Sequence, residues 1–198
     1  MERIRTDRYG QCVIRSSNKR DELLRRIVVY LETHGIADLS LSPMATELGT
    51  SKRMLLYYFG SRENLTHEAI AVSRPHVADL FGSAEDIAAL REAATRLWQA
   101  ITVGAQQRPI RILFQLLSLA PTQPEQYHAL ADEAVHAMVD PLAKVYRNLG
   151  VAELDAQAKA TLLISGLRGL CQDRMITGDI ERTDTAAHLL IRTATTLP

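Results

Sequence analysis

Basic and aromatic residues gather between positions 51 and 62 with the types and spacing that DNA recognition uses. Arginine or lysine at the start of a helix can bind O6 and N7 of guanine, and methionine can contact the thymine methyl group. Tyrosine hydroxyls and an arginine that follow can reach phosphate oxygens and set the register. The predicted DNA-contacting residues are Ser40, Ser51, Lys52, Arg53, Met54, Tyr57, Tyr58 and Arg62.

Two short helices joined by a tight turn are predicted to present these side chains. Gly49 closes the first helix, at a position that favours positive φ, and the second helix covers about 51–59. Met44, Leu48 and Leu55 can face inward together. After so short a turn the second helix must cross the first steeply, which is a helix-turn-helix arrangement.

The alternative for this segment is an ordinary helical surface. Tyr57, Tyr58 and Phe59 would then be core aromatics, and Lys52 and Arg53 a solvated face. We expect Phe59 to be buried. The core positions are already supplied by leucine and methionine, so we expect the two tyrosines to be exposed.

The whole chain is predicted to be all-α, with about nine helices and no β-type alternation. We expect a flexible basic arm over 1–17, a three-helix DNA-binding domain over 18–65, and a helical-bundle domain over 66–198. The breaks that separate the later helices predict ranges near 84–106, 109–120, 124–148, 153–177 and 182–197. Pro75 and Pro141 fall inside helical patterns and are expected to kink or split them.

The distribution of charge separates the two predicted domains. Residues 1–67 carry 11 Lys and Arg against 8 Asp and Glu, whereas residues 68–198 carry 12 against 15. A basic leading third indicates a polyanionic partner. Cys12 and Cys171 lack metal-ligand spacing and are expected to be reduced thiols. No secretory signal or membrane-spanning run is visible, which favours a cytoplasmic protein without a membrane partner.

The segment "RDELLRRIVVYLETHGIADLSLSPMATELGTSKRMLLYYFGSRENL" resembles the TetR-type one-component transcriptional regulators. The shared pattern has an amphipathic first helix, "A…LG.S" through the turn, "L.YYF" closing the recognition helix and "SRENL" opening the next helix. Leu56 stands where the family usually has tyrosine, and Tyr58 where it often has histidine. The resemblance implies a homodimer that binds palindromic double-stranded DNA and a larger domain that senses a small molecule of unknown identity.

The larger domain offers candidates for both of those roles. The helices that enclose a cavity in this family carry the ligand-binding candidates Trp98, Phe114, Gln115, Tyr127 and His128, with Met138 as the weakest. The helices near 153–177 and 182–197 carry the predicted dimer-interface residues Leu163, Gly166, Leu167, Leu170 and Leu190. Each pocket candidate is individually also compatible with core or surface, and the glycines with packing inside one subunit.

No catalytic constellation, metal-ligand cluster or cofactor motif is visible, so we expect no enzyme activity and no cofactor. The function that the sequence favours is a repressor released from its operator by an effector. The alternative is a helix-turn-helix regulator that obeys a protein partner or acts without ligand. A larger domain without an enclosed cavity above roughly 300 Å³ would favour that alternative.

Overall fold

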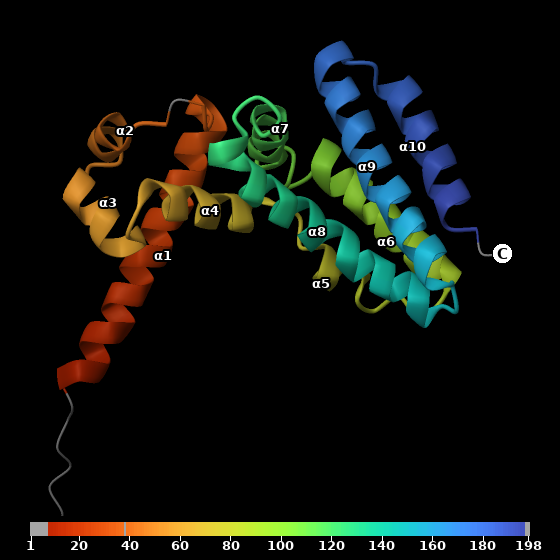
Figure 1. The fold of residues 1–198 in the computed structure, drawn as a ribbon, viewed down its shortest axis with the longest axis horizontal. Helices are drawn as coiled ribbons and strands as arrows, with labels where there is room; N and C mark the ends of the chain where they lie inside the picture. The colour runs from red at the N-terminus through yellow and green to blue at the C-terminus, as the bar shows by residue number, and fades with distance from the viewer. Residues whose placement is uncertain (1–7, 38, 197–198) are drawn as a thin grey trace, which may run out of the picture. The chain divides into compact units, whose positions relative to one another are not determined.

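The computed structural model describes residues 8–37 and 39–196, and its secondary structure over these residues is entirely helical. Ten helices follow one another along the chain (Figure 1). The chain divides into two compact units, Met1–Val72 and Ser73–Pro198. The all-α prediction is confirmed. The unit boundary falls near the end of the fourth helix, later than the predicted boundary after Leu65.

The N-terminal unit contains α1 (Arg8–His34), α2 (Leu41–Glu47), α3 (Lys52–Phe59) and α4 (Arg62–Ser73). Helix α1 begins well before residue 18, so the predicted arm is helical from Arg8 onward, and residues 1–7 lie outside the described part of the chain. No proline interrupts residues 8–34, so the backbone hydrogen bonding can continue. Gly35, with φ of 79°, ends the helix.

The core of the N-terminal unit forms where the apolar stripe of α1 meets the next three helices. The buried side chains are Leu23, Ile27, Leu31, Met44, Leu48, Leu55, Phe59, Leu65 and Ile70. Along each helix most of these positions lie four residues apart, as expected for helices that bury one face. The core therefore fixes which face of each short helix points outward.

The C-terminal unit contains α5 (Val77–Phe81), α6 (Ile87–Thr102), α7 (Ile110–Leu119), α8 (Pro124–Asn148), α9 (Glu153–Thr177) and α10 (Ile180–Ala194). Helix α9 packs against both α8 and α10 (Figure 1). The Tyr146 hydroxyl of α8 donates to the Ala194 carbonyl of α10 across 2.9 Å. Helix α9 is therefore covered on two sides within a single chain.

The two prolines predicted to break helices behave differently. Pro75 lies in the gap between α4 and α5, as expected. Pro141 lies inside α8, which continues through it, so this proline does not split the helix predicted near 124–148. Val139, Leu142 and Ala143 are buried around it, and this packing holds the helix together across the missing N–H donor.

Candidate nucleic-acid interface and ligand cavity

The turn between α2 and α3 is held by local hydrogen bonds. Gly49 has φ of 60°, and the Thr50 N–H donates to the Ala45 carbonyl across 2.9 Å. The Ser51 hydroxyl then accepts from the Met54 N–H across 3.2 Å and caps α3. These bonds set the direction in which α3 leaves the turn. The helix-turn-helix predicted from the spacing is therefore present.

Helix α3 buries one face and exposes the other. Leu55 and Phe59 are 0% and 2% exposed, whereas Tyr57 is 74% exposed. The other outward side chains are Lys52, Arg53, Met54 and Leu56. Tyr58 is half-buried, and its ring meets that of Tyr57 edge-on, with 5.2 Å between centroids. The expectation of a buried Phe59 is confirmed, and Tyr57 is not a core residue.

The exposed charges of α3 are available for a partner. Neither Lys52 nor Arg53 forms an ion pair with another residue that the structure describes. Ser40 is exposed at the N-cap of α2, and its side chain makes no capping hydrogen bond. Of the residues predicted to contact DNA, Ser40, Ser51, Lys52, Arg53, Met54 and Tyr57 are therefore exposed to solvent.

Arg62 is partly engaged within the unit. Its Nε donates to Glu63 Oε1 across 3.2 Å, and its Nη1 donates to the Leu39 carbonyl across 3.4 Å. The pKa of the Glu63 carboxyl lies below its usual value because of its hydrogen bond to the backbone at the start of α4 and that from Arg62. Arg62 therefore links α4 to the segment before α2, and only part of its guanidinium can reach a phosphate.

Arg20, which joins three helices, is a residue that the sequence pattern does not single out. Its Nη2 lies 2.6 and 2.5 Å from the two Glu68 oxygens, and its Nε donates to the Tyr58 carbonyl across 3.2 Å. The guanidinium also lies 5.0 Å from the centre of the Phe59 ring. Arg20 thus positions the end of α3. The Arg20–Glu68 pair spans 48 residues, so no local pattern announces it.

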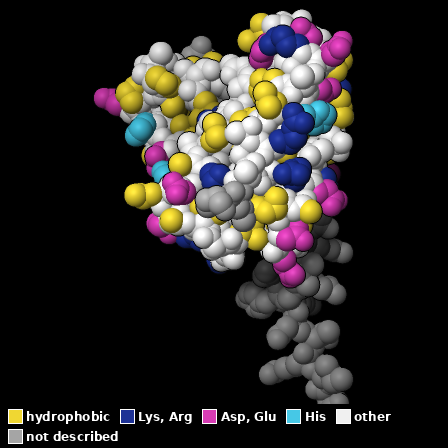
Figure 2. All heavy atoms as spheres, turned by 90° about the vertical axis from the view of Figure 1, so that its right-hand side faces the viewer, with side chains coloured by type: hydrophobic (Ala, Val, Ile, Leu, Met, Phe, Trp, Pro, Cys, Tyr) yellow, Lys and Arg dark blue, Asp and Glu magenta, His cyan; other side chains and the backbone are white. Residues whose placement is uncertain are grey.

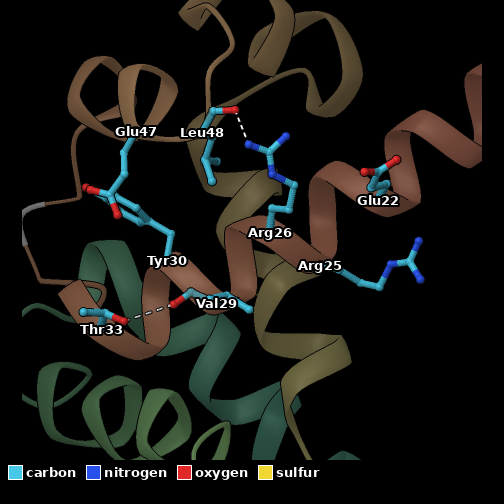
Figure 3. A pocket seen from close by; sticks show the side chains of 8 residues that line it. All are labelled: Glu22, Arg25, Arg26, Val29, Tyr30, Thr33, Glu47 and Leu48. Carbon is cyan, nitrogen blue, oxygen red and sulfur yellow. Dashed lines mark hydrogen bonds between the residues drawn. The ribbon is translucent and has the colours of Figure 1, made fainter.

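An open hollow of about 480 Å³ lies between α1 and α2 (Figure 3). Arg26 points across it and donates to the Leu48 carbonyl at the end of α2. A cation at this end is favourable for the helix dipole. Arg25 also lines the hollow, and no hydrogen bond joins it to the other residues drawn there. The hydrogen bond from Arg26 therefore connects α1 to the end of α2 across this hollow.

A small, partly open cavity lies within the C-terminal unit. It is lined by Pro75, Val77, Leu97, Ile101, Ile110, Leu113, Met138, Ile164, Leu167 and Arg168. Its volume is about 20 Å³, which is room for about one water molecule. Arg168 is its only charged residue. The Arg168 Nη1 is buried and has no hydrogen-bond partner, and burial lowers the pKa of this guanidinium.

The predicted ligand-binding residues are not those that line this cavity. Trp98 is buried, but its Nε1 donates to Asp184 across 2.7 Å, and the Arg174 guanidinium lies 4.7 Å from its ring. Tyr127 is buried and accepts from Gln126 across 3.0 Å, while His128 is exposed. Phe114 and Gln115 are half-buried on α7, outside the lining.

For Trp98 and Phe114, the predicted residue and the residue that lines the cavity differ by one helix position. Leu97 and Leu113 line the cavity, and each directly precedes a predicted residue in the chain. A one-residue step turns a helical side chain by about 100°, from the cavity toward a neighbouring helix. Met138, the weakest candidate, does line the cavity.

Cys171 lies on the same helix as Arg168. It is buried, and its thiol donates to the Ile101 carbonyl across 3.4 Å. Burial raises the pKa of the Cys171 thiol to about 11, so the thiol is protonated at neutral pH. The side chain of Cys12 lies outside the described residues.

The predicted dimer-interface residues of α9 and α10 are mostly internal. Leu163 and Leu167 are 0% and 1% exposed within one chain, so they cannot form the surface of an interface. A Cβ at Gly166 would lie 2.4 Å from the Leu190 side chain of the same chain. Gly166 therefore allows α9 to approach α10, which is the alternative of packing inside one subunit. Leu170 is half-buried.

Other apolar residues of α9 and α10 do point outward. They are Leu154, Leu162, Met175, Ile176, Ile180 and Leu189. Figure 2 shows the side of the C-terminal unit on which α10 lies, where apolar side chains alternate with basic and acidic ones. The exposed apolar side chains, rather than the charged ones, are of the kind found at the core of protein interfaces.

No protein-family model matches the chain, and no curated protein matches its sequence. Solved structures do match its fold. A TetR-family regulator from Cytophaga hutchinsonii aligns with a TM-score of 0.71 and 14% identity over 91% of this chain and 94% of its own. A TetR-family regulator from Agrobacterium tumefaciens aligns with a TM-score of 0.69 and 17% identity over 89% and 97%.

A third match is the multidrug binding protein EbrR in complex with proflavin, with a TM-score of 0.59 and 20% identity over 87% of this chain and 98% of that one. Within residues 8–37 and 39–196, no helix is long and apolar enough to span a membrane. The same residues contain no cluster of three potential metal ligands. This chain has the fold of the TetR-family transcriptional regulators.

Proposed function

We propose that this protein is a DNA-binding transcriptional regulator that reads a palindromic operator through α3. The carrying observation is the division of α3 into a buried face and an exposed face with Lys52, Arg53, Met54 and Tyr57. A helix held in this way can enter the major groove, where its N-terminal residues meet base edges. The protein would act in the cytoplasm, with the DNA.

A homodimer is the second element of the proposal. Two helix-turn-helix units read both half-sites of a palindrome when their recognition helices stand about 34–36 Å apart, or a multiple of that distance. The exposed apolar side chains of α9 and α10 support this assembly, with Ile176 78% and Leu189 56% exposed. An interface formed by them replaces the one predicted from Leu163 and Leu167.

Release by a small-molecule effector is the third element. Pro75 lines the internal cavity and follows Ser73, the last residue of α4, by two positions. A ligand that displaces Pro75 would therefore pull on the end of α4 through the chain itself. Coupling is reciprocal, so DNA must weaken ligand affinity by the factor by which the ligand weakens DNA affinity. The EbrR structure contains a bound small molecule in the same fold.

The size of the cavity favours a second candidate function. A volume of about 20 Å³ lies far below the roughly 300 Å³ of an ordinary ligand pocket. By this measure the protein is a regulator controlled by a protein partner, or one that acts without a ligand. The unpartnered Arg168 nitrogen in the same cavity supports the effector instead. A ligand screen by thermal shift, followed by titration into the operator complex, separates the two.

The test of DNA recognition begins with selection of an operator from random double-stranded DNA. Arg53→Ala is expected to reduce the preference for operator over random DNA about 5- to 150-fold, since a lost bidentate base contact removes about 1–3 kcal/mol of discrimination. Tyr58→Phe and Arg62→Ala should weaken binding to both DNAs alike. Arg25→Ala, an exposed arginine on α1, is the matched control.

Fluorescence anisotropy on the two DNAs gives the affinities. Equal loss on operator and random DNA for Arg53→Ala would show that this residue contacts only phosphate. A wild-type protein that selects no sequence would refute the proposed function.

A further inference from the structure

Arg168 stands out among the residues that line the internal cavity, because every other lining side chain is apolar. Its Nη1 is buried and has no hydrogen-bond partner. Its Nη2 donates to the Ser165 hydroxyl across 3.2 Å, a neutral group one turn earlier on α9. One guanidinium nitrogen, Nη2, is thus hydrogen-bonded, whereas the other, Nη1, has no hydrogen-bond partner.

No counter-charge accompanies this arginine. Among the residues that the structure describes, no aspartate or glutamate forms an ion pair with Arg168. A guanidinium cannot escape the problem by losing its proton, because its pKa remains too high in proteins. Arg168 is half-buried as a whole, so solvent offsets part of the cost of this unpaired charge, while Nη1 itself is shielded from water. A single water in a cavity of about 20 Å³ can supply a hydrogen bond but no charge.

We propose that Arg168 anchors a ligand that carries one carboxylate group on an apolar body and binds in this cavity. The ligand would be the effector, so the inference rests on the proposed function. Arginine and carboxylate match in geometry and form strong, charge-assisted hydrogen bonds. Leu97, Ile101 and Ile164 provide apolar surface for the remainder of the molecule.

The lining distinguishes a carboxylate from a phosphate. A phosphate brings three or more acceptor oxygens and up to two charges, all of which need partners once buried. The lining supplies a single cation and no other polar side chain. One carboxylate balances that cation, whereas a phosphate would bury further unsatisfied oxygens.

Binding must enlarge the cavity. Met138 is the lining side chain that moves most easily, because methionine is unbranched and has three rotatable bonds. Pro75 is the lining residue that lies next to α4 in the chain. A ligand body that pushes against Pro75 would therefore convert occupancy into a displacement of the segment between α4 and α5.

The test compares acids with neutral molecules of the same shape. Calorimetry on the full-length protein would measure the Kd of straight-chain carboxylates from butyrate to palmitate, and of benzoate, phenylacetate and salicylate, each beside its primary amide. At least one acid should bind about 10- to 100-fold more tightly than its amide, as expected for charge-assisted hydrogen bonds. Arg168→Met should reduce its affinity to that of the amide. Arg111→Met, an exposed arginine on α7, should leave it unchanged.

Three results would overturn the inference. They are no binding of any acid, equal affinity for acid and amide, or undiminished acid binding by Arg168→Met. If Arg168→Met does not fold, the comparison of acid and amide on the wild type decides alone.

Titration of the ligand into the operator complex distinguishes the carboxylate site from the proposed effector release. An acid that binds through Arg168 without changing operator affinity upholds the site and contradicts effector release. A neutral compound that binds in the cavity and releases the protein from DNA supports the proposed effector release and contradicts the proposal that the effector carries a carboxylate.

Discussion

Arg20 connects α1 to both α3 and α4, so its replacement by methionine should loosen α3 without touching its exposed face. Methionine retains the apolar stem but removes the ion pair with Glu68, the hydrogen bond to the Tyr58 carbonyl and the contact with the Phe59 ring. The perturbation is confined to the N-terminal unit, because all four residues belong to it.

The expected magnitude follows from the exposure of these groups. The side chains of Arg20 and Glu68 are 35% and 21% exposed, so solvent screens the pair in part. We assign it about 1–1.5 kcal/mol, between a surface pair and a fully buried one. The cation–ring contact and the bond to Tyr58 each add about 0.5–1 kcal/mol. Arg20→Met should therefore destabilise the unit by about 2–3.5 kcal/mol.

Hydrogen exchange measured by mass spectrometry is the suitable assay. Peptides from α3 and α4 should exchange about 30-fold faster or more in Arg20→Met, since 1.4 kcal/mol corresponds to a factor of ten. Arg25→Met is the matched control on the same helix and should change exchange less than about threefold. The single tryptophan, Trp98, lies in the C-terminal unit, so its fluorescence should show an unchanged unfolding transition there.

Equal exchange rates in Arg20→Met and Arg25→Met would refute the reasoning. That result would mean that water replaces all three interactions of Arg20 without loss. A second check is the double replacement with Glu68→Gln. Its effect should fall short of the sum of the single effects by about 1 kcal/mol, because the pair is shared.

Two further predictions concern the C-terminal unit. Gly166→Val should lower stability by about 1–3 kcal/mol, because the new side chain meets Leu190 and cannot be accommodated by a small rotation, as alanine could be. A Cβ at Gly169 meets nothing within 4 Å, so Gly169→Ala should instead raise stability by up to about 1 kcal/mol. Thermal unfolding that ranks the two variants in the opposite order would contradict the packing of α9 against α10. Ile176→Glu should weaken self-association at least about tenfold in sedimentation, whereas Val103→Glu, with a similar exposure of 73% against 78%, should not. Equal dimer affinity for both variants would place the interface elsewhere.

The sequence by itself determined the features that depend on neighbours within about four residues. The ends of α8 and α9 agree with the predicted ranges, because proline and glycine mark them locally. The turn around Gly49 and the cap at Ser51 were likewise predictable, since the bonds that form them lie within a few positions. The outward direction of Tyr57 followed from counting the core positions already filled.

Tertiary structure alone decided the features that depend on which helices meet. Trp98 and Leu97 are both buried apolar positions on α6, and the sequence cannot say which one faces α10 and which one the cavity. Leu163 and Leu167 form an apolar stripe that is equally compatible with a core and with a dimer interface. The packing of α8 and α10 against α9 places both leucines in the core. In the sequence Arg168 looks like any charged helix residue, and only the packing of the helices shows that it lines a cavity with one nitrogen buried. Burial is a property of the assembled helices, so a local pattern cannot contain it.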